Sequence, residues 1–258
     1  MSYQSIAKPI MQFLSHFEQP KILEIGVDKG QTAIPLCHNL TLLNRPFLYD
    51  GVDILVQESV VNILTNMSRV VYLDFEPKIP SFNVRLFEKN SLYLLPKLAE
   101  KSAKYNLILL DGDHNYHTVY NELLVLDKLT LPSTLIVCDD YNTRWAHKDM
   151  FYSEREEYSG TQKATNRIAG KKKGVKAAIE DFVAQSEGKW SLAYVAPSDY
   201  CILYQPLAIS NLDMFTPPGT TSPNWQILEV YFNKEECPEV KGSLIKNLEY
   251  VYSRKGDK

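Results

Sequence analysis

Two apolar segments of the sequence stop abruptly at acidic residues. The segment 106–110 is followed by Asp111-Gly112-Asp113-His114, and the segment 134–138 is followed by Asp139-Asp140. If both segments are neighbouring strands of a parallel sheet, their carboxyl ends bring these side chains to one edge. Three of the aspartates, Asp111, Asp139 and Asp140, offer hard oxygen ligands, with no cysteine among them and one histidine alongside. Such a set favours Mg²⁺, with Ca²⁺ or Mn²⁺ as alternatives, over Zn²⁺.

A turn containing two glycines follows the first predicted strand. The run Glu24-Ile25-Gly26-Val27-Asp28-Lys29-Gly30 lies between a strand over 21–25 and a helix over about 32–43. Glycines at such a turn let the backbone approach a ligand closely. The spacing G-x-x-x-G is not the G-x-G-x-x-G fingerprint of dinucleotide-binding proteins. The next strand, over 47–54, closes on Asp53, so a second carboxylate reaches the same edge of the sheet.

The segments that must position these residues alternate between strand and helix patterns. Such alternation predicts an α/β fold with a mostly parallel sheet, helices on both faces and ligands at the carboxyl ends of the strands. Ser91 is expected to cap the helix that follows the third strand. The expected helices are 6–17, 32–43, a stretch ending at Met67, 92–103, 119–129 and 243–253. The expected strands are 21–25, 47–54, 84–87, 106–110 and 134–138, with a closing antiparallel hairpin of 191–196 and 200–204.

The motifs resemble those of class I S-adenosylmethionine-dependent methyltransferases. The run from Glu24 to Gly30 is similar to their E-x-G-x-G-x-G motif, with Asp28 in place of the middle glycine, as in a branch of small-molecule O-methyltransferases. Asp111-Gly112-Asp113-His114 together with Asp139-Asp140-Tyr141 resembles the metal-dependent macrocin-type sugar O-methyltransferases. The resemblance covers roughly residues 20–206. It implies a Rossmann-like, seven-stranded sheet, mostly parallel, with a C-terminal antiparallel hairpin.

The resemblance also implies a role for each of these residues. Asp53 would hold the ribose hydroxyls of S-adenosylmethionine, because a carboxylate accepts two hydrogen bonds from a diol. Ser91 would lie near the adenine, although a serine there is equally well explained as a helix cap. The implied cofactor-binding residues are Glu24, Gly26, Gly30, Asp53, Asn90, Ser91 and Asp111. The implied metal ligands are Asp111, Asp139 and Asp140.

The expected reaction is metal-dependent methyl transfer to a hydroxyl of a small molecule, such as a sugar or a polyhydroxylated natural product. A divalent cation lowers the pKa of the acceptor hydroxyl, and a neighbouring base takes its proton. Asp113 and His114 are both candidates for that base, and the sequence does not choose between them. Two other functions remain open: a cephalosporin-hydroxylase-like enzyme on the same fold, and a non-catalytic module that binds S-adenosylmethionine.

The residues between the fifth strand and the closing hairpin are candidates for substrate contacts. The polar segment 141–174 is expected to cover the site as a lid, with Trp145, His147 and Tyr152 as its contacts. Tyr116, His117 and Asn142 are candidates for the acceptor pocket. The run Lys171-Lys172-Lys173 is expected to be a solvated loop.

Length and composition restrict the possible domain organisation, partners and location of the protein. With 258 residues, 45% of them hydrophobic, the chain can form one α/β domain over 1–206 and an extension over 207–258 for packing or homo-oligomer formation. A net charge of −3 argues against a nucleic-acid partner. No apolar run approaches the roughly 20 residues of a membrane span, and the first residues lack a signal-peptide pattern, so we expect a cytoplasmic protein without a membrane partner. The four scattered cysteines are expected to be small buried hydrophobes.

Overall fold

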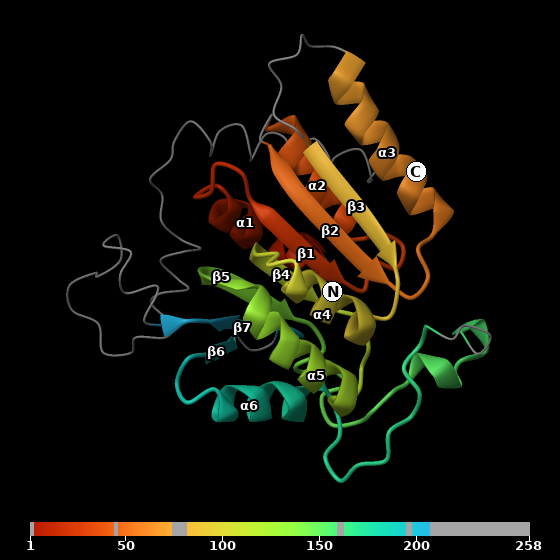
Figure 1. Cartoon of the computed structure of the whole chain (residues 1–258), viewed down its shortest axis with the longest axis vertical. Helices are drawn as coiled ribbons and strands as arrows, with labels where there is room; N and C mark the ends of the chain where they lie inside the picture. The colour runs from red at the N-terminus through yellow and green to blue at the C-terminus, as the bar shows by residue number, and fades with distance from the viewer. Residues whose placement is uncertain (1–2, 44–45, 74–81, 159–162, 195–197, 207–258) are drawn as a thin grey trace.

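A seven-stranded sheet lies at the centre of the fold (Figure 1). The computed structural model describes residues 3–43, 46–73, 82–158, 163–194 and 198–206, so the predicted helix 243–253 and the extension 207–258 lie outside the described residues. The strand order is β3-β2-β1-β4-β5-β7-β6. The strands are β1 Lys21–Ile25, β2 Phe47–Asp53, β3 Phe82–Glu88, β4 Tyr105–Leu110, β5 Thr130–Cys138, β6 Ser191–Tyr194 and β7 Cys201–Tyr204.

The first five strands are parallel to one another, whereas β7 runs antiparallel to both β5 and β6. This arrangement confirms the predicted Rossmann-like sheet with its antiparallel C-terminal hairpin. The helices are α1 Tyr3–Leu14, α2 Ala33–Leu42, α3 Glu58–Leu73, α4 Ser91–Glu100, α5 Tyr116–Leu126 and α6 Val175–Gln185. Short 3₁₀ turns cover Asp127–Leu129, Tyr152–Glu154 and Glu156–Tyr158.

Helices cover both faces of the sheet because the central strands are apolar on both sides. In β4, Leu107 and Leu109 belong to one hydrophobic cluster, whereas Ile108 and Leu110 belong to another. Successive side chains of a strand point to opposite faces, so these two clusters lie on opposite sides of the sheet. The first cluster includes residues of α1, α2 and α3, and the second includes residues of α4, α5 and α6. The expected two-faced packing is thereby confirmed.

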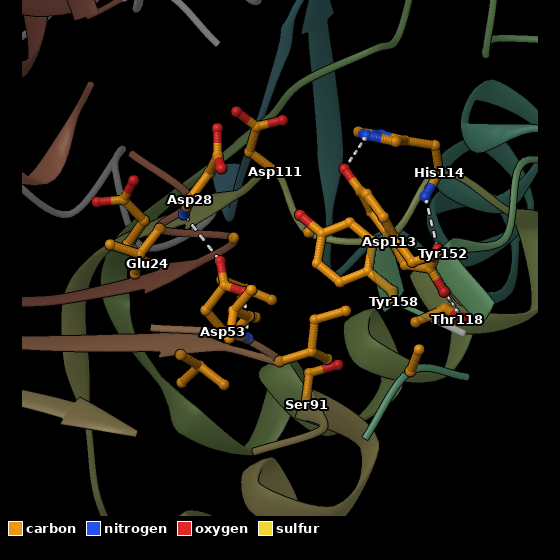
Figure 2. A pocket seen from close by; sticks show the side chains of 18 of the residues that line it. Glu24, Asp28, Asp53, Ser91, Asp111, Asp113, His114, Thr118, Tyr152 and Tyr158 are labelled. Atoms are coloured by element: carbon orange, nitrogen blue, oxygen red, sulfur yellow. Dashed lines mark hydrogen bonds between the residues drawn. The ribbon is translucent and has the colours of Figure 1, made fainter. Parts of the chain in front are cut away.

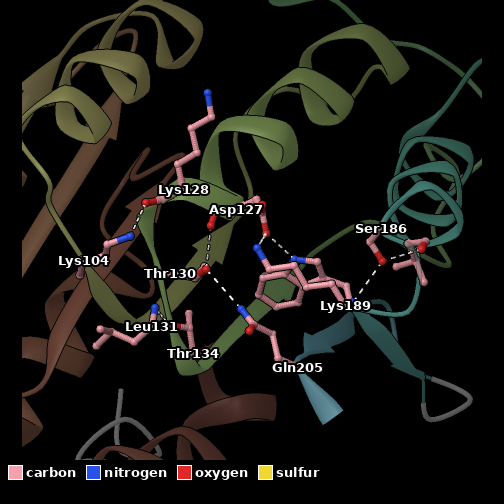
Figure 3. Close-up of polar contacts among 11 residues, drawn as sticks. Lys104, Asp127, Lys128, Thr130, Leu131, Thr134, Ser186, Lys189 and Gln205 are labelled. Atoms are coloured by element: carbon pink, nitrogen blue, oxygen red, sulfur yellow. Dashed lines mark hydrogen bonds and ion pairs between the residues drawn. The ribbon is translucent and has the colours of Figure 1, made fainter. Parts of the chain in front are cut away.

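The amino end of β5 is tied to the antiparallel hairpin by a polar cluster (Figure 3). The carboxylate of Asp127 accepts hydrogen bonds from the indole N–H of Trp190 at 2.7 Å and from Lys189 at 2.6 Å. Thr130 donates to the main-chain oxygen of Asp127, and Gln205 donates to the hydroxyl of Thr130. These contacts fix the hairpin against β5 at the end of the sheet opposite to the acidic strand ends.

Helix α6 is an element that the sequence analysis did not include. Its buried residues Val175, Ala178, Ile179 and Phe182 follow the i, i+3, i+4, i+7 pattern of an amphipathic helix. The helix follows directly after Gly174, which has φ +84°, and the lysine-rich run before that glycine masked its start. Within the described residues, no helix combines the length and apolar character needed to cross a membrane.

Candidate functional site

A cavity of about 720 Å³ opens at the carboxyl ends of the parallel strands. Its volume lies in the range of small-molecule and cofactor sites, roughly 300–1,000 Å³. The residues that the sequence singled out supply much of its lining (Figure 2). Those that line it are Glu24, Gly26, Asp53, Asn90, Ser91, Asp111, Asp113, His114, Asp139 and Asp140. The structure therefore gathers nearly all of the predicted site residues around one space.

Gly26 is required by the close approach of two backbone segments. It has φ +91°, and a Cβ atom at this position would lie 2.0 Å from the main-chain oxygen of Asp111. Gly30, at φ +70°, closes the turn by donating its N–H to the oxygen of Val27 at 2.8 Å. The described residues that line the cavity do not include Gly30. Its position is explained by the turn, whereas Gly26 borders the cavity itself.

Asp53 connects the end of β2 to the glycine turn. Its carboxylate accepts hydrogen bonds from the N–H of Asp28 at 2.8 Å and from the N–H of Leu55 at 2.9 Å. Burial raises the pKa of Asp53, and the hydrogen bonds from Leu55, Asp28 and Val27 oppose that rise. Figure 2 shows the contact between Asp53 and Asp28 on the same side of the cavity as Glu24. The carboxylate is thereby held in one orientation before any ligand arrives.

Glu24 is a second acid at this end of the cavity, and it is almost fully buried. The hydroxyl of Tyr49 donates to its carboxylate at 2.6 Å. Burial raises the pKa of Glu24 to about 8, although the hydrogen bond from Tyr49 acts in the opposite direction. The group is therefore largely neutral at pH 7 in the folded chain.

The start of α4 differs from the expectation in one respect. Asn90, not Ser91, is the helix cap, because its side-chain oxygen accepts the N–H of Leu92 at 2.9 Å. The prediction that Ser91 caps the helix was wrong, since Ser91 is already the first helical residue. Its hydroxyl is directed instead to Glu122 of α5, at 2.5 Å. This leaves Ser91 in the cavity wall and in a side-chain contact that the sequence did not reveal.

His114 and Asp140 are in side-chain contact at the ends of β4 and β5. Their Nδ1 and Oδ2 atoms are 2.5 Å apart, and Thr143 donates to the other oxygen of Asp140 at 2.6 Å. Burial raises the pKa of Asp140, but the hydrogen bond and charge of His114 and the hydrogen bond of Thr143 bring it below its ordinary value. Asp140 has φ +59°, a left-handed conformation, and it lines the cavity. The carboxylate of Asp140 is therefore charged at neutral pH.

Potential metal-ligating atoms of Asp111, His114 and Asp140 lie within 4.8 Å of one another. Asp139 also lines the cavity but is not part of that group. Burial, followed by the charge of Asp139, raises the pKa of Asp111 well above its ordinary value. The structure thus brings together two of the three predicted ligands with a histidine, and it places the third close enough to repel Asp111.

Asp113 and His114 have different partners although they are adjacent in sequence. The carboxylate of Asp113 accepts the hydroxyl of Thr118 at 2.8 Å and the N–H of His114 at 3.1 Å. Burial raises the pKa of Asp113, and the contacts with Thr118 and His114 oppose the rise. The Nε2 atom of His114, in contrast, is 3.1 Å from the hydroxyl of Tyr152. The histidine therefore has one nitrogen on a carboxylate and the other on a hydroxyl group.

The fold and the lining agree with a family match. Residues 23–141 match the model of a methyltransferase domain. This segment therefore resembles a methyltransferase domain. It runs from β1 to the residue after the Asp139-Asp140 pair, and so contains the glycine turn and every residue predicted to be catalytic, to bind the cofactor or to ligate the metal. No curated protein matches the chain significantly in sequence.

Several solved methyltransferases align with this chain at low identity, and CalS11 shares its fold. CalS11, described as a TDP-rhamnose 3'-O-methyltransferase of calicheamicin biosynthesis, aligns at 12% identity over 78% of this chain and 77% of its own, with a TM-score of 0.51. MycE, a methyltransferase of the mycinamycin pathway in complex with Mg and SAH, aligns at 14% identity over 78% of this chain, with a TM-score of 0.48. This chain spans only 49% of the length of MycE. PaMTH1 from Podospora anserina aligns at 14% identity over 80% of both chains, with a TM-score of 0.45.

The segment after the methyltransferase domain supplies another wall of the cavity. From the predicted lid 141–174, the lining includes Trp145, Tyr152 and Tyr158. The rings of Trp145 and His114 stack with their centroids 6.1 Å apart, and the ring of Tyr152 meets that of Tyr158 edge-on at 4.9 Å. The side chain of Asn90 donates to the main-chain oxygen of Lys163 at 2.7 Å, which attaches the later part of this segment to α4.

Several other predicted contacts lie elsewhere. The described lining does not include Tyr116, His117, Asn142 or His147, and the run 171–173 is exposed, as expected of a solvated loop. Tyr116 donates to Asp181 of α6 at 2.7 Å, so it joins two helices. Conversely, Thr118 and Glu122 line the cavity although the sequence analysis did not consider them. Their spacing of four residues on α5, in step with Asn115 at the helix cap, is the signal that could have shown a shared face.

Proposed function

We propose that this chain transfers a methyl group from S-adenosylmethionine to a hydroxyl of a small polyhydroxylated molecule, with His114 as the base and a divalent cation at the acidic strand ends. The observation that carries this proposal is that one cavity joins the glycine turn and Asp53 to the His114–Asp140 pair. The glycine turn and Asp53 suit a nucleoside that carries an amino-acid tail. The His114–Asp140 pair suits an acceptor hydroxyl that must lose a proton.

The donor half of the cavity has the chemistry of a ribose site. Asp53 is held by two main-chain N–H groups of the turns around it, and a carboxylate has room for further hydrogen bonds from a diol. The Gly26 turn brings main chain to the cavity wall. CalS11 is similar at a level that concerns the fold alone, so the acceptor class rests on the acidic and aromatic lining.

The contacts favour His114 over Asp113 as the base. When Nδ1–H of His114 donates to Asp140, Nε2 becomes an acceptor, and the hydroxyl of Tyr152 occupies its acceptor position at 3.1 Å. A substrate hydroxyl in the place of the Tyr152 hydroxyl would have the geometry for proton transfer. The charged Asp140 would stabilise the imidazolium that forms. Asp113 is less suited, because its oxygens already accept from Thr118 and from the main chain.

The acidic donor set fits a hard cation. Asp111 and Asp140 contribute carboxylates to one group, and the charge of Asp139 near Asp111 is a repulsion that a cation would offset. A divalent cation held there would make the acceptor hydroxyl more acidic. We assign Asp111 and Asp140 as its ligands with Asp139 completing the set, which leaves His114 for the proton.

Calorimetry with S-adenosylhomocysteine tests the donor site. Wild type should bind this product, and Asp53→Ala should weaken binding by about 10- to 100-fold, because hydrogen bonds to a charged acceptor contribute about 1.5–3 kcal/mol each. Glu58→Ala, on the exposed start of α3, is the matched control and should bind as wild type does. Failure of the wild type to bind S-adenosylhomocysteine would overturn the proposal.

Turnover tests the base. The assay follows methylation of catechol, methyl rhamnoside and TDP-rhamnose, and the variants are then compared on the acceptor that reacts. His114→Ala should lower kcat by about 10²–10⁴-fold with unchanged affinity for S-adenosylhomocysteine. His117→Ala, whose side chain lies outside the described lining, is the matched control and should retain activity. A loss below tenfold in His114→Ala, with a large loss in Asp113→Asn, would reverse the assignment.

Titration with Mn²⁺ tests the cation site. Asp111→Asn and Asp139→Asn should each weaken Mn²⁺ binding, whereas His114→Ala should leave it within about threefold of the wild type. If His114→Ala abolished Mn²⁺ binding and Asp139→Asn did not, the histidine would be a ligand instead of the base. Activity that survives complete chelation would remove the cation from the proposal.

A further inference from the structure

Glu122 is a buried acid in the cavity wall that the proposed reaction does not use. Glu122 lies on α5, is only 1% exposed and lines the cavity. Its Oε1 atom accepts the hydroxyl of Ser91 at 2.5 Å. Its Oε2 atom is buried and has no hydrogen-bond partner within the described part of the chain. An unpaired oxygen of this kind is a group that a ligand in the cavity could complete.

The position of Glu122 relates it to the donor half of the cavity. Ser91 follows β3 directly, and Asp53 at the end of β2 is paired in register with Glu88 at the end of β3. Asp53 and Ser91 therefore stand at the ends of adjacent strands, and Figure 2 shows Ser91 on the same side of the cavity as Asp53. A nucleoside whose ribose contacts Asp53 would extend its base toward Ser91 and Glu122.

The hydrogen-bonding state of Glu122 is defined by its surroundings. Burial, together with the charge of Asp113, raises the pKa of Glu122 to about 8, and the hydrogen bond from Ser91 opposes the rise. The carboxyl group is then mostly protonated at pH 7. Since Oε1 accepts from Ser91, the hydrogen resides on Oε2, which becomes a donor. Adenine offers ring nitrogens as acceptors at N1, N3 and N7.

We propose that Glu122, held in place by Ser91, selects the adenine base of the methyl donor through a hydrogen bond from its Oε2 to a ring nitrogen. This inference rests on the proposed function, because it assumes that the donor occupies the cavity with its ribose at Asp53. It assigns a specificity-determining role to α5, an element that contributes none of the residues predicted to bind the cofactor.

A cycle of protein and ligand variants tests the hydrogen bond. S-Adenosylhomocysteine and its 1-deaza, 3-deaza and 7-deaza analogues, in which one ring nitrogen is replaced by C–H, are titrated by calorimetry. One analogue should bind wild type at least about tenfold more weakly, the equivalent of one hydrogen bond. In Glu122→Leu the same analogue and the parent compound should bind within about threefold of each other. Glu122→Gln, whose amide can still donate, should retain most of the preference.

Glu24→Gln is the matched control, because Glu24 is also buried in this cavity and its pKa is also raised to about 8. That variant should keep the wild-type ratio between parent and analogue, whatever its effect on the affinity for all ligands together. Equal ratios in wild type and Glu122→Leu for all three analogues would overturn the inference. Binding of S-adenosylhomocysteine by wild type with no such preference would leave the proposed function standing, whereas absence of binding would end both.

Infrared difference spectroscopy covers the case in which Glu122→Leu does not fold. Adding S-adenosylhomocysteine to wild type should shift the C=O stretch of a protonated carboxyl group. Glu122→Gln, which conserves shape, should lack that band, and Glu24→Gln should retain it. A band that persists in Glu122→Gln would refute the contact with the base.

Discussion

Replacing Gly26 by alanine tests whether the site depends on the contact between the ends of β1 and β4. The residue has φ +91°, and an added Cβ would lie 2.0 Å from the main-chain oxygen of Asp111 and 2.4 Å from its carbonyl carbon. Neither atom belongs to a flexible side chain. The N–H of Asp111 also donates to the oxygen of Ile25 at 2.8 Å, so the two segments cannot separate without losing a hydrogen bond.

The expected cost has two parts. A non-glycine residue in the left-handed region costs about 1–2 kcal/mol. Forcing a methyl group into a packed contact typically costs a further 1–3 kcal/mol or so. Gly188→Ala isolates the first part, because Gly188 has φ +84° and a Cβ there would meet nothing within 4 Å. We therefore expect a loss of about 1–2 kcal/mol for Gly188→Ala and about 2–5 kcal/mol for Gly26→Ala.

Urea unfolding followed by circular dichroism measures both variants under one set of conditions. Gly26→Ala should also weaken Mn²⁺ binding, because the main chain that must move carries the side chain of Asp111. Gly188→Ala should not affect Mn²⁺ binding. If the two variants lost the same stability, the close approach of the strands would have no energetic consequence and the explanation for Gly26 would be refuted.

Two further predictions concern buried charges. Glu24 binds its proton more tightly in the folded than in the unfolded chain, so the free energy of unfolding of the wild type should fall as pH rises from about 4.5 to about 8. Glu24→Gln should make this fall with pH less steep. Equal pH dependence of the free energy of unfolding in the wild type and in Glu24→Gln would contradict the prediction. Arg85 donates twice to the fully buried Asp50, both at 2.6 Å. Arg85→Met should cost about 3 kcal/mol in urea unfolding, and the double variant Asp50→Asn/Arg85→Met should cost less, because no buried charge then lacks its partner.

The sheet could be predicted because its strands carry strong local signals. In β4, six consecutive buried residues end at Asp111, so both the strand and its end are marked in the sequence. The same property predicted which residues meet, since parallel strands place their carboxyl ends at one edge. Helix α6 was missed because it follows Gly174 and three lysines, and its four buried positions are separated by charged and small residues.

The partners of the site residues could not be predicted, because each partner comes from a distant segment. Ser91 meets Glu122 31 residues later, and Asn90 meets Lys163 across 73 residues. A serine at a helix start has a sufficient local explanation as a cap, and nothing near it in sequence indicates that Asn90 takes this role. Side-chain contacts between helices depend on how α4 and α5 pack, which local patterns do not specify.

The choice between Asp113 and His114 as the base could not be predicted from the sequence either. The two residues are neighbours at one strand end, and both residue types can act as a general base. What separates them is the charge that faces each one: His114 is paired with Asp140, which reaches it through a backbone at φ +59° that no residue pattern indicated. Asp113 faces the neutral hydroxyl of Thr118 instead. A base that becomes positively charged gains from a carboxylate partner, whereas the oxygens of Asp113 already accept hydrogen bonds from Thr118 and from the main chain, so the contacts favour the histidine.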